Sequence, residues 1–269
     1  MNDYRSHLSV TTWIVLASLA LGQLITLPER TFSLSVFGSP IDFHFSASFL
    51  GGMIALAATW TGLEAALRTH PQKDLLRRTF RFWGLPTAIV LSGAVLLPAI
   101  SANGVWLLVL GLTGVMLAMS LAAEYHTVDP ESKTYDNARL LLNGLGYAVA
   151  AVVFIQLYRS NSRSLVSATL IGLIAGLLSL DMLRRNQVPL RLIFLYSVVI
   201  AVVMAQLTVV LNYWPFASVR VALMLLVGFY FLIGISQQIL REELTRRRFF
   251  EYLLVSGIMV MIIFFFPIT

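Results

Sequence analysis

Six ionisable side chains near the ends of the predicted helices have the types and spacing from which a chemical site could be built. Carboxylates and an imidazole can bind a metal ion or exchange protons with a substrate, and arginine can hold a phosphate. We therefore predict a polar cluster at the cytoplasmic face. Its members are Glu64, Arg68, Glu124, His126, Asp129 and Asp181.

A structural interpretation of the same residues is favoured, because each of the deepest acids has a base about one helical turn away. Glu64 precedes Arg68 by four residues, and Asp181 precedes Arg184 by three and Arg185 by four. Arginine side chains at helix ends reach the interface easily, so we expect helix-end ion pairs. The loop over residues 124–139 contains an Asp-Pro turn former, and we expect turns and a helix cap there rather than a metal or phosphate site.

The positions of the other ionisable groups exclude several mechanisms. No acid or histidine lies in the middle of a predicted span, which disfavours proton-driven transport. The four histidines fall in loops, which excludes a haem held between two helices, and the two lysines lie outside the spans, which excludes a retinal Schiff base. The chain has no cysteine, so thiolate catalysis and iron–sulfur clusters are excluded as well. The sequence points to no particular cofactor.

The composition is that of a protein embedded in a lipid bilayer. Of the 269 residues, 58% are apolar and 12% are charged, about half the charged share of a soluble domain. Uncharged runs of about 17 or more residues, enough to cross about 30 Å of hydrocarbon, occur nine times. We predict an all-α integral membrane bundle of about nine transmembrane helices, forming a single polytopic domain over residues 1–269. The runs are Leu8–Leu27, Ser46–Leu67, Phe82–Ile100, Val105–Ala123, Leu140–Leu157, Leu165–Leu180, Leu192–Leu211, Val221–Leu240 and Tyr252–Phe266.

The distribution of Lys and Arg supports this count. With nine spans, fifteen of the nineteen basic residues fall on the side of the N-terminus. The opposite side receives only Arg30, Arg159, Arg163 and Arg220. Cytoplasmic loops carry an excess of Lys and Arg, so we predict a multi-pass protein of the bacterial inner membrane with a cytoplasmic N-terminus and an external C-terminus.

Residues 31–45, between the first two spans, alternate apolar and polar side chains around a Gly-Ser-Pro turn. This pattern predicts a short external β-hairpin with one apolar face. We expect it to act as a lid on helix ends or on the lipid interface, and a docking strand for a partner is the alternative.

Small residues spaced four apart predict close helix contacts on two spans. One ridge comprises Ala47, Gly51 and Ala55, and the other comprises Ala168, Gly172 and Gly176. The spacing leaves open whether each ridge packs within the chain or against another subunit.

Two basic segments, Asp74–Phe80 and Glu243–Phe249, match each other at an offset of 169 residues. We attribute the match to shared interface chemistry, because arginines followed by aromatic residues are typical of a segment on an anionic leaflet, where each cation contributes about 1 kcal/mol. We predict contacts with lipid headgroups or a partner for Arg77, Arg78, Arg81, Arg246, Arg247 and Arg248. Since the net charge of +6 lies largely in such loops, nucleic acid is not expected as a partner.

Three short loop motifs carry a resemblance to a known family. They are Arg68-Thr-His-Pro71, Glu124-Tyr125 with Val128-Asp129-Pro130, and Tyr213-Trp214-Pro215. On these residues the chain resembles an uncharacterised bacterial polytopic membrane protein family, a domain of unknown function of the Chloroflexota type. The resemblance would cover most of the chain, and it implies a multi-span fold without assigning an activity.

These observations predict a non-catalytic inner-membrane protein that acts as a scaffold or subunit of a membrane complex, and that binds lipids or another lipophile between its helices. Membrane-protein partners or a homo-oligomer are the expected assemblies. The alternative is a carrier or membrane enzyme for a lipid-linked substrate, with the six-residue polar cluster as its site. Convergence of the second, fourth and sixth span ends below a cavity would favour that alternative.

Overall fold

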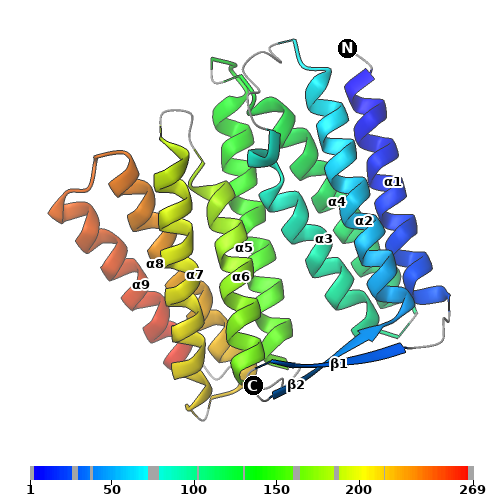
Figure 1. Cartoon of the computed structure of the whole chain (residues 1–269). Coiled ribbons are helices and arrows are strands. Elements are labelled where there is room, and N and C mark those ends of the chain that lie inside the picture. Colours follow the sequence, from blue (N-terminus) through cyan, green and yellow to red (C-terminus); the bar gives the residue numbers. More distant parts are fainter. Residues whose placement is uncertain are drawn as a thin grey trace. The chain divides into compact units, whose positions relative to one another are not determined.

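The computed structural model contains nine α-helices in the residues that it describes and divides into two compact units, Met1–Arg139 and Leu140–Thr269. It describes residues 3–25, 30–36, 39–71, 79–101, 103–129, 131–159, 164–184, 188–214 and 216–265. Each unit is a bundle of roughly antiparallel helices (Figure 1). The prediction of a single domain over residues 1–269 stays a prediction.

The first unit is built from four helices. They are α1 (Asp3–Leu24), α2 (Ala47–Arg68), α3 (Gly84–Leu96) and α4 (Gly104–His126). Helix α1 packs against α2 and α4, and α3 packs against the same two helices, so the four form a closed ring. Short 3-10 turns flank α3, η2 (Thr79–Phe82) before it and η3 (Leu97–Ala99) after it.

Two strands lie between α1 and α2. β1 (Arg30–Val36) and β2 (Ser39–Phe45) pair antiparallel, with Arg30 opposite Phe45 and Val36 opposite Ser39. The proposed roles of this segment, a lid or a docking strand, depend on side chains that lie outside the described ones.

Side-chain hydrogen bonds join helix ends at one end of the first unit. Gln23 at the end of α1 accepts a hydrogen bond from the indole of Trp106 at 2.5 Å and donates one to the carbonyl oxygen of Ile100 at 3.0 Å. Asn103 caps α4 by accepting from the backbone N–H groups of Val105 and Trp106. The end of α1 is therefore held beside the start of α4.

The second unit contains α5 (Tyr135–Arg159), whose first turn belongs to the first unit, followed by α6 (Ser164–Met182), α7 (Leu190–Asn212), α8 (Ser218–Leu240) and α9 (Arg246–Phe265). Its centre is the fully buried Phe229 of α8, whose ring meets Phe154 and Tyr147 of α5 edge-on at about 6 Å between centroids. Helix α6 packs against α7, and α9 packs chiefly against α8.

Both predicted small-residue ridges form close contacts within the chain. A Cβ atom on Gly51 of α2 would lie 2.6 Å from the carbonyl oxygen of Ser18 in α1. A Cβ atom on Gly172 of α6 would lie 2.9 Å from the carbonyl oxygen of Ala201 in α7. The prediction of close helix contacts is therefore confirmed. At these two glycines the contact is made within the chain.

The prediction of nine membrane spans is wrong. Among the described residues, seven helices are long and apolar enough to cross a membrane, namely α1, α2, α4, α5, α7, α8 and α9. The runs predicted at Phe82–Ile100 and Leu165–Leu180 correspond to the shorter apolar helices Gly84–Ala99 and Val166–Met182. The first is shortened because the α-helix ends at Leu96 and passes into a 3-10 turn at Pro98, which cannot donate a backbone hydrogen bond. At 1.5 Å per residue, thirteen α-helical residues cover about 20 Å.

Candidate functional site

The first unit gathers histidine and tyrosine side chains where the start of α1 and the ends of α2 and α4 meet. The ring of Tyr4 in α1 stacks on Tyr125 in α4 with 4.4 Å between centroids. His70, just after α2, lies edge-on to Tyr125 at 4.8 Å. His126 stands edge-on to both tyrosines, at 6.4 Å from Tyr4 and 5.8 Å from Tyr125. We call Tyr4, His70, Tyr125 and His126 the aromatic cluster.

The predicted acids of the first unit lie at the same helix ends and differ in burial. Glu124, in the last turn of α4, is fully buried and accepts a hydrogen bond from the hydroxyl of Thr127 at 3.3 Å. Glu64 accepts from Arg68 at 2.5 Å, and the Arg68 side chain is 74% exposed. The predicted ion pair between Glu64 and Arg68 is therefore confirmed, at the surface.

Partial burial lowers the pKa of His70 below the ordinary histidine value of 6.5, because desolvation disfavours the charged imidazolium. The nearby carboxylate of Asp129 opposes this shift, and His126 adds to it. The described residues include no group of three His, Asp or Glu side chains placed to hold a metal ion.

Asp181, the sixth residue of the predicted polar cluster, belongs to the second unit. Its carboxylate lies 3.3 Å from Nη1 of Arg184, one of the two predicted partners. The other, Arg185, lies outside the described residues. The side chains are only 1% and 8% exposed, so this ion pair is buried rather than reaching solvent. Of the six residues, the structure groups five at one end of the first unit, and their relation to Asp181 stays a prediction.

The basic segment at the start of α9 carries opposing charges that weaken it as a cationic patch. Arg247 lies 3.0 Å from Glu251, and Arg248 lies 2.7 Å from Glu243. In the corresponding segment before α3, Arg77 and Arg78 lie outside the described residues, as does the side chain of Arg81. The predicted lipid or partner contacts of all six arginines stay predictions.

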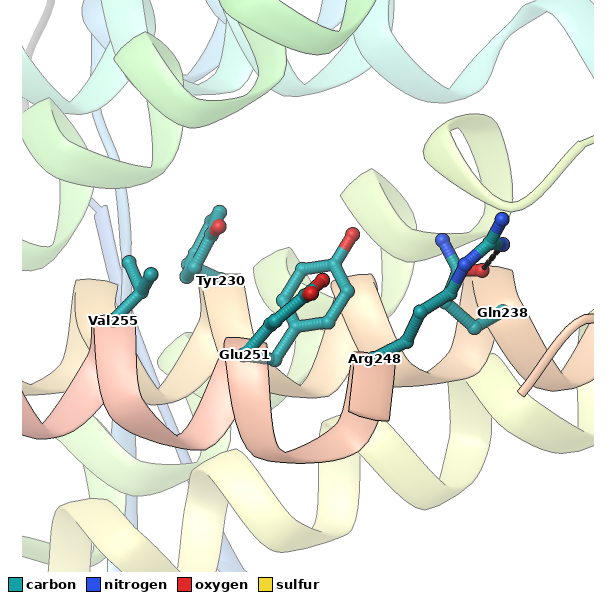
Figure 2. Close-up of a pocket in the computed structure, with 6 residues that line it drawn as sticks. Tyr230, Gln238, Arg248, Glu251 and Val255 are labelled. Carbon is teal, nitrogen blue, oxygen red and sulfur yellow. Dashed lines mark hydrogen bonds between the residues drawn. The ribbon is translucent and has the colours of Figure 1, made fainter. Parts of the chain in front are cut away.

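A hollow of about 300 Å³ lies between α8 and α9. Figure 2 shows Arg248 and Gln238 joined by a hydrogen bond at one end of the hollow, and Val255 and Tyr230 toward its other end. The hollow is lined by Tyr230, Gln238, Arg248, Glu251, Tyr252 and Val255.

Sequence reasoning missed this hollow, although part of its signal is present. Positions 248, 251, 252 and 255 are spaced three, four and seven apart, so they share one face of α9. Polar and aromatic residues on one face of an otherwise apolar helix could have indicated a site. The contribution of Tyr230 and Gln238 required the register of α8 against α9, which sequence spacing does not give.

A family profile described as "Protein of unknown function (DUF5656)" matches residues 27–266. The chain belongs to this family. No curated protein and no solved structure matches the chain.

Membership in the DUF5656 family confirms the predicted resemblance to an uncharacterised family of unknown function. The likeness covers most of the chain, as expected. The Chloroflexota type stays a prediction. Together with the seven candidate spans, the match describes a multi-pass membrane protein whose family carries no assigned activity.

Proposed function

We propose that this protein is a non-catalytic scaffold or subunit of a complex in the bacterial inner membrane, and that α9 is the helix it presents to a transmembrane helix of another subunit. The N-terminus is cytoplasmic in this proposal, because the basic residues concentrate on its side.

The uncovered surface of α9 carries the proposal. Only 11% of its apolar window is buried, the lowest share among the seven candidate spans. Side chains at positions spaced three or four apart are exposed along the outer face of α9, so they form one continuous apolar stripe. The stripe comprises Leu254, Ile258, Met261 and Phe265. Contiguous apolar stripes of this kind supply the van der Waals contacts through which membrane helices associate.

Photo-crosslinking in intact membranes tests the proposal. A benzoylphenylalanine at Met261, which is 60% exposed, is expected to capture one defined polypeptide. Truncating the neighbouring contacts with Ile258→Ala and Phe265→Ala is expected to reduce the adduct several-fold, because apolar contact area is lost. A probe at Ser256, which is buried, serves as the control and is expected to react within the chain. Recovery of the monomer alone, with neither a partner nor a bound lipophile, contradicts the scaffold role.

The carrier or membrane enzyme for a lipid-linked substrate is the second candidate, and one observation favours it. The ends of α2 and α4 converge, as the 4.8 Å approach of His70 and Tyr125 indicates. Mass spectrometry of lipophiles that copurify with the protein tests this candidate. A polyprenyl-linked or phosphorylated lipid that is retained by the native chain and lost in both Glu124→Gln and Arg68→Gln would support it.

A further inference from the structure

We propose that the hollow between α8 and α9 binds the headgroup of a phospholipid that carries a primary ammonium group beside its phosphate, as phosphatidylethanolamine does. This site goes beyond the scaffold role, because it uses the polar lining of the hollow and not the apolar stripe of α9. The argument rests on charge, on hydrogen-bond donors and on the change in polarity along the hollow.

Arg248 is the phosphate ligand. Its Nη1 donates to Oε1 of Gln238 at 2.5 Å and to Oε2 of Glu243 at 2.7 Å, so the guanidinium is held in place before a ligand arrives. A guanidinium carries further N–H donors on Nη2 and Nε, which suit the oxygen atoms of a phosphate. Arg248 also lies in the first turn of the 20-residue helix α9, where the helix dipole favours an anion.

Glu251 is the ammonium ligand. It lies three residues after Arg248 on α9 and lines the same hollow, so a positive and a negative side chain stand side by side. The contact that Glu251 makes with Arg247 is between exposed side chains, 58% and 90% accessible, and such pairs contribute little. A ligand with an ammonium group can therefore compete for this carboxylate.

The local charge argues against a purely anionic headgroup. Residues 241–251 contain four arginines and three glutamates, which leaves a net charge of only +1. An anionic lipid would satisfy Arg248 and meet the carboxylate of Glu251 with a like charge. A headgroup with both charges satisfies both side chains.

The inner end of the hollow suits the glycerol and the start of the acyl chains. Tyr230 and Tyr252 have ring centroids 5.8 Å apart and line the hollow together with Val255. Tyrosine has an apolar ring and a polar hydroxyl, the combination that sits at membrane interfaces. The polarity thus falls from Arg248 toward Val255, as it does from the phosphate to the hydrocarbon of a phospholipid, and about 300 Å³ is within the range of small-ligand sites.

Native mass spectrometry of the full chain tests this site. The protein is equilibrated in one detergent with equal amounts of phosphatidylethanolamine, phosphatidylglycerol and phosphatidylcholine. Phosphatidylethanolamine is expected to be retained about tenfold more than the other two. Glu251→Gln is expected to bring its retention down to that of phosphatidylglycerol, and Arg248→Gln to lower the retention of both.

Arg241→Gln is the matched control, because Arg241 is an exposed arginine outside the lining of the hollow. Equal retention of the three lipids by the native chain overturns the proposal, as does an Arg241→Gln effect as large as that of Arg248→Gln. Free phosphoethanolamine is tested separately by thermal stability, and stabilisation equal to that given by the lipid would reassign the site to a soluble ligand. If Arg248→Gln does not fold, the retention of the lipids by Arg248→Lys and Glu251→Gln still tests the proposal. Crosslinking through Met261 is expected to be unaffected by Glu251→Gln, so the two proposals fail separately.

Discussion

Two helix-end ion pairs lie in opposite surroundings, and this decides what each contributes to stability. Asp181 and Arg184 are almost fully buried at 3.3 Å, whereas Arg68 is mostly exposed beside Glu64. Removing one partner of a buried ion pair costs about 3–5 kcal/mol. An exposed pair is worth about 0–1 kcal/mol.

We therefore expect Arg184→Met to lower the free energy of unfolding by about 3 kcal/mol or more, and Arg68→Met by about 1 kcal/mol or less. Unfolding in mixed micelles, followed by circular dichroism, measures both. The double variant Asp181→Asn with Arg184→Met is expected to recover part of the loss, because the buried charge is removed with its partner. Equal losses for the two single variants would contradict the assigned burial.

His70 makes the stability of the first unit depend on pH. Its pKa is lowered by desolvation, so below pH 6.5 the unfolded chain binds a proton that the folded chain does not. The folded state is then fully stable with respect to this group above pH 6.5 and loses stability as the pH falls from 6.5 toward the lowered pKa. We expect His70→Gln to lose less stability than the native chain over this range, since glutamine does not titrate.

Thermal unfolding at pH 7.5 and at several values between 6.5 and 5 measures the difference between the two chains. A direct NMR titration of the His70 ring, assigned by comparison with His70→Gln, gives the pKa itself. A midpoint at or above 6.5 would show that the cluster does not desolvate His70.

At the scale of the helix, contact between α1 and α2 depends on the absence of a side chain at Gly51. A Cβ atom there would lie 2.6 Å from Ser18 O and 2.8 Å from Gly22 Cα, and both are backbone atoms that cannot rotate away. We expect Gly51→Ala to destabilise the first unit by about 1–3 kcal/mol, the usual cost of overpacking. Gly111→Ala is the matched control, because nothing lies within 4 Å of its Cβ position and alanine favours the helix. Thermal unfolding of the two variants in one detergent makes the comparison, and equal melting temperatures would contradict the close contact.

The positions of the helices could be predicted from the sequence. Whether each helix is long enough to cross a membrane could not. Hydropathy placed an apolar run on each of the nine helices, and residue spacing identified Gly51 and Gly172 as contact points. One of the two errors in the span count arose at Pro98, where an uncharged run continues although the α-helix has ended. Burial of Asp181 and the hollow at Arg248 depend on neighbouring helices, and no local pattern encodes them.

At the scale of the whole molecule, contacts between helix ends define the path of the chain in each unit. In the first unit, Tyr4 and Tyr125 bring the start of α1 to the end of α4, and Gln23 and Trp106 join the two opposite ends. His70 places the end of α2 with the end of α4, so α3 carries the chain from that end of the unit to the other despite its short length.

The second unit follows the same alternation. The hydroxyl of Tyr158 donates to the carbonyl oxygen of Thr208, which joins the ends of α5 and α7. The amide of Gln237 donates to the carbonyl oxygen of Met182, which joins the ends of α6 and α8. Within each unit, the described basic residues therefore concentrate at one end, whether or not every helix crosses the bilayer.

This path predicts which loops share a side of the membrane. The chain has no cysteine of its own, so each introduced cysteine is the only reactive thiol. Pro71→Cys and Glu131→Cys, both at exposed positions, are expected to react with an impermeant maleimide from one side, and Ser101→Cys from the other. Oriented vesicles of both polarities measure this, and the positive-inside rule assigns the side of residues 71 and 131 to the cytoplasm. Labelling of residues 71 and 101 from the same side would mean that α3 does not return the chain across the unit, and the asymmetry of charge could then no longer orient the protein.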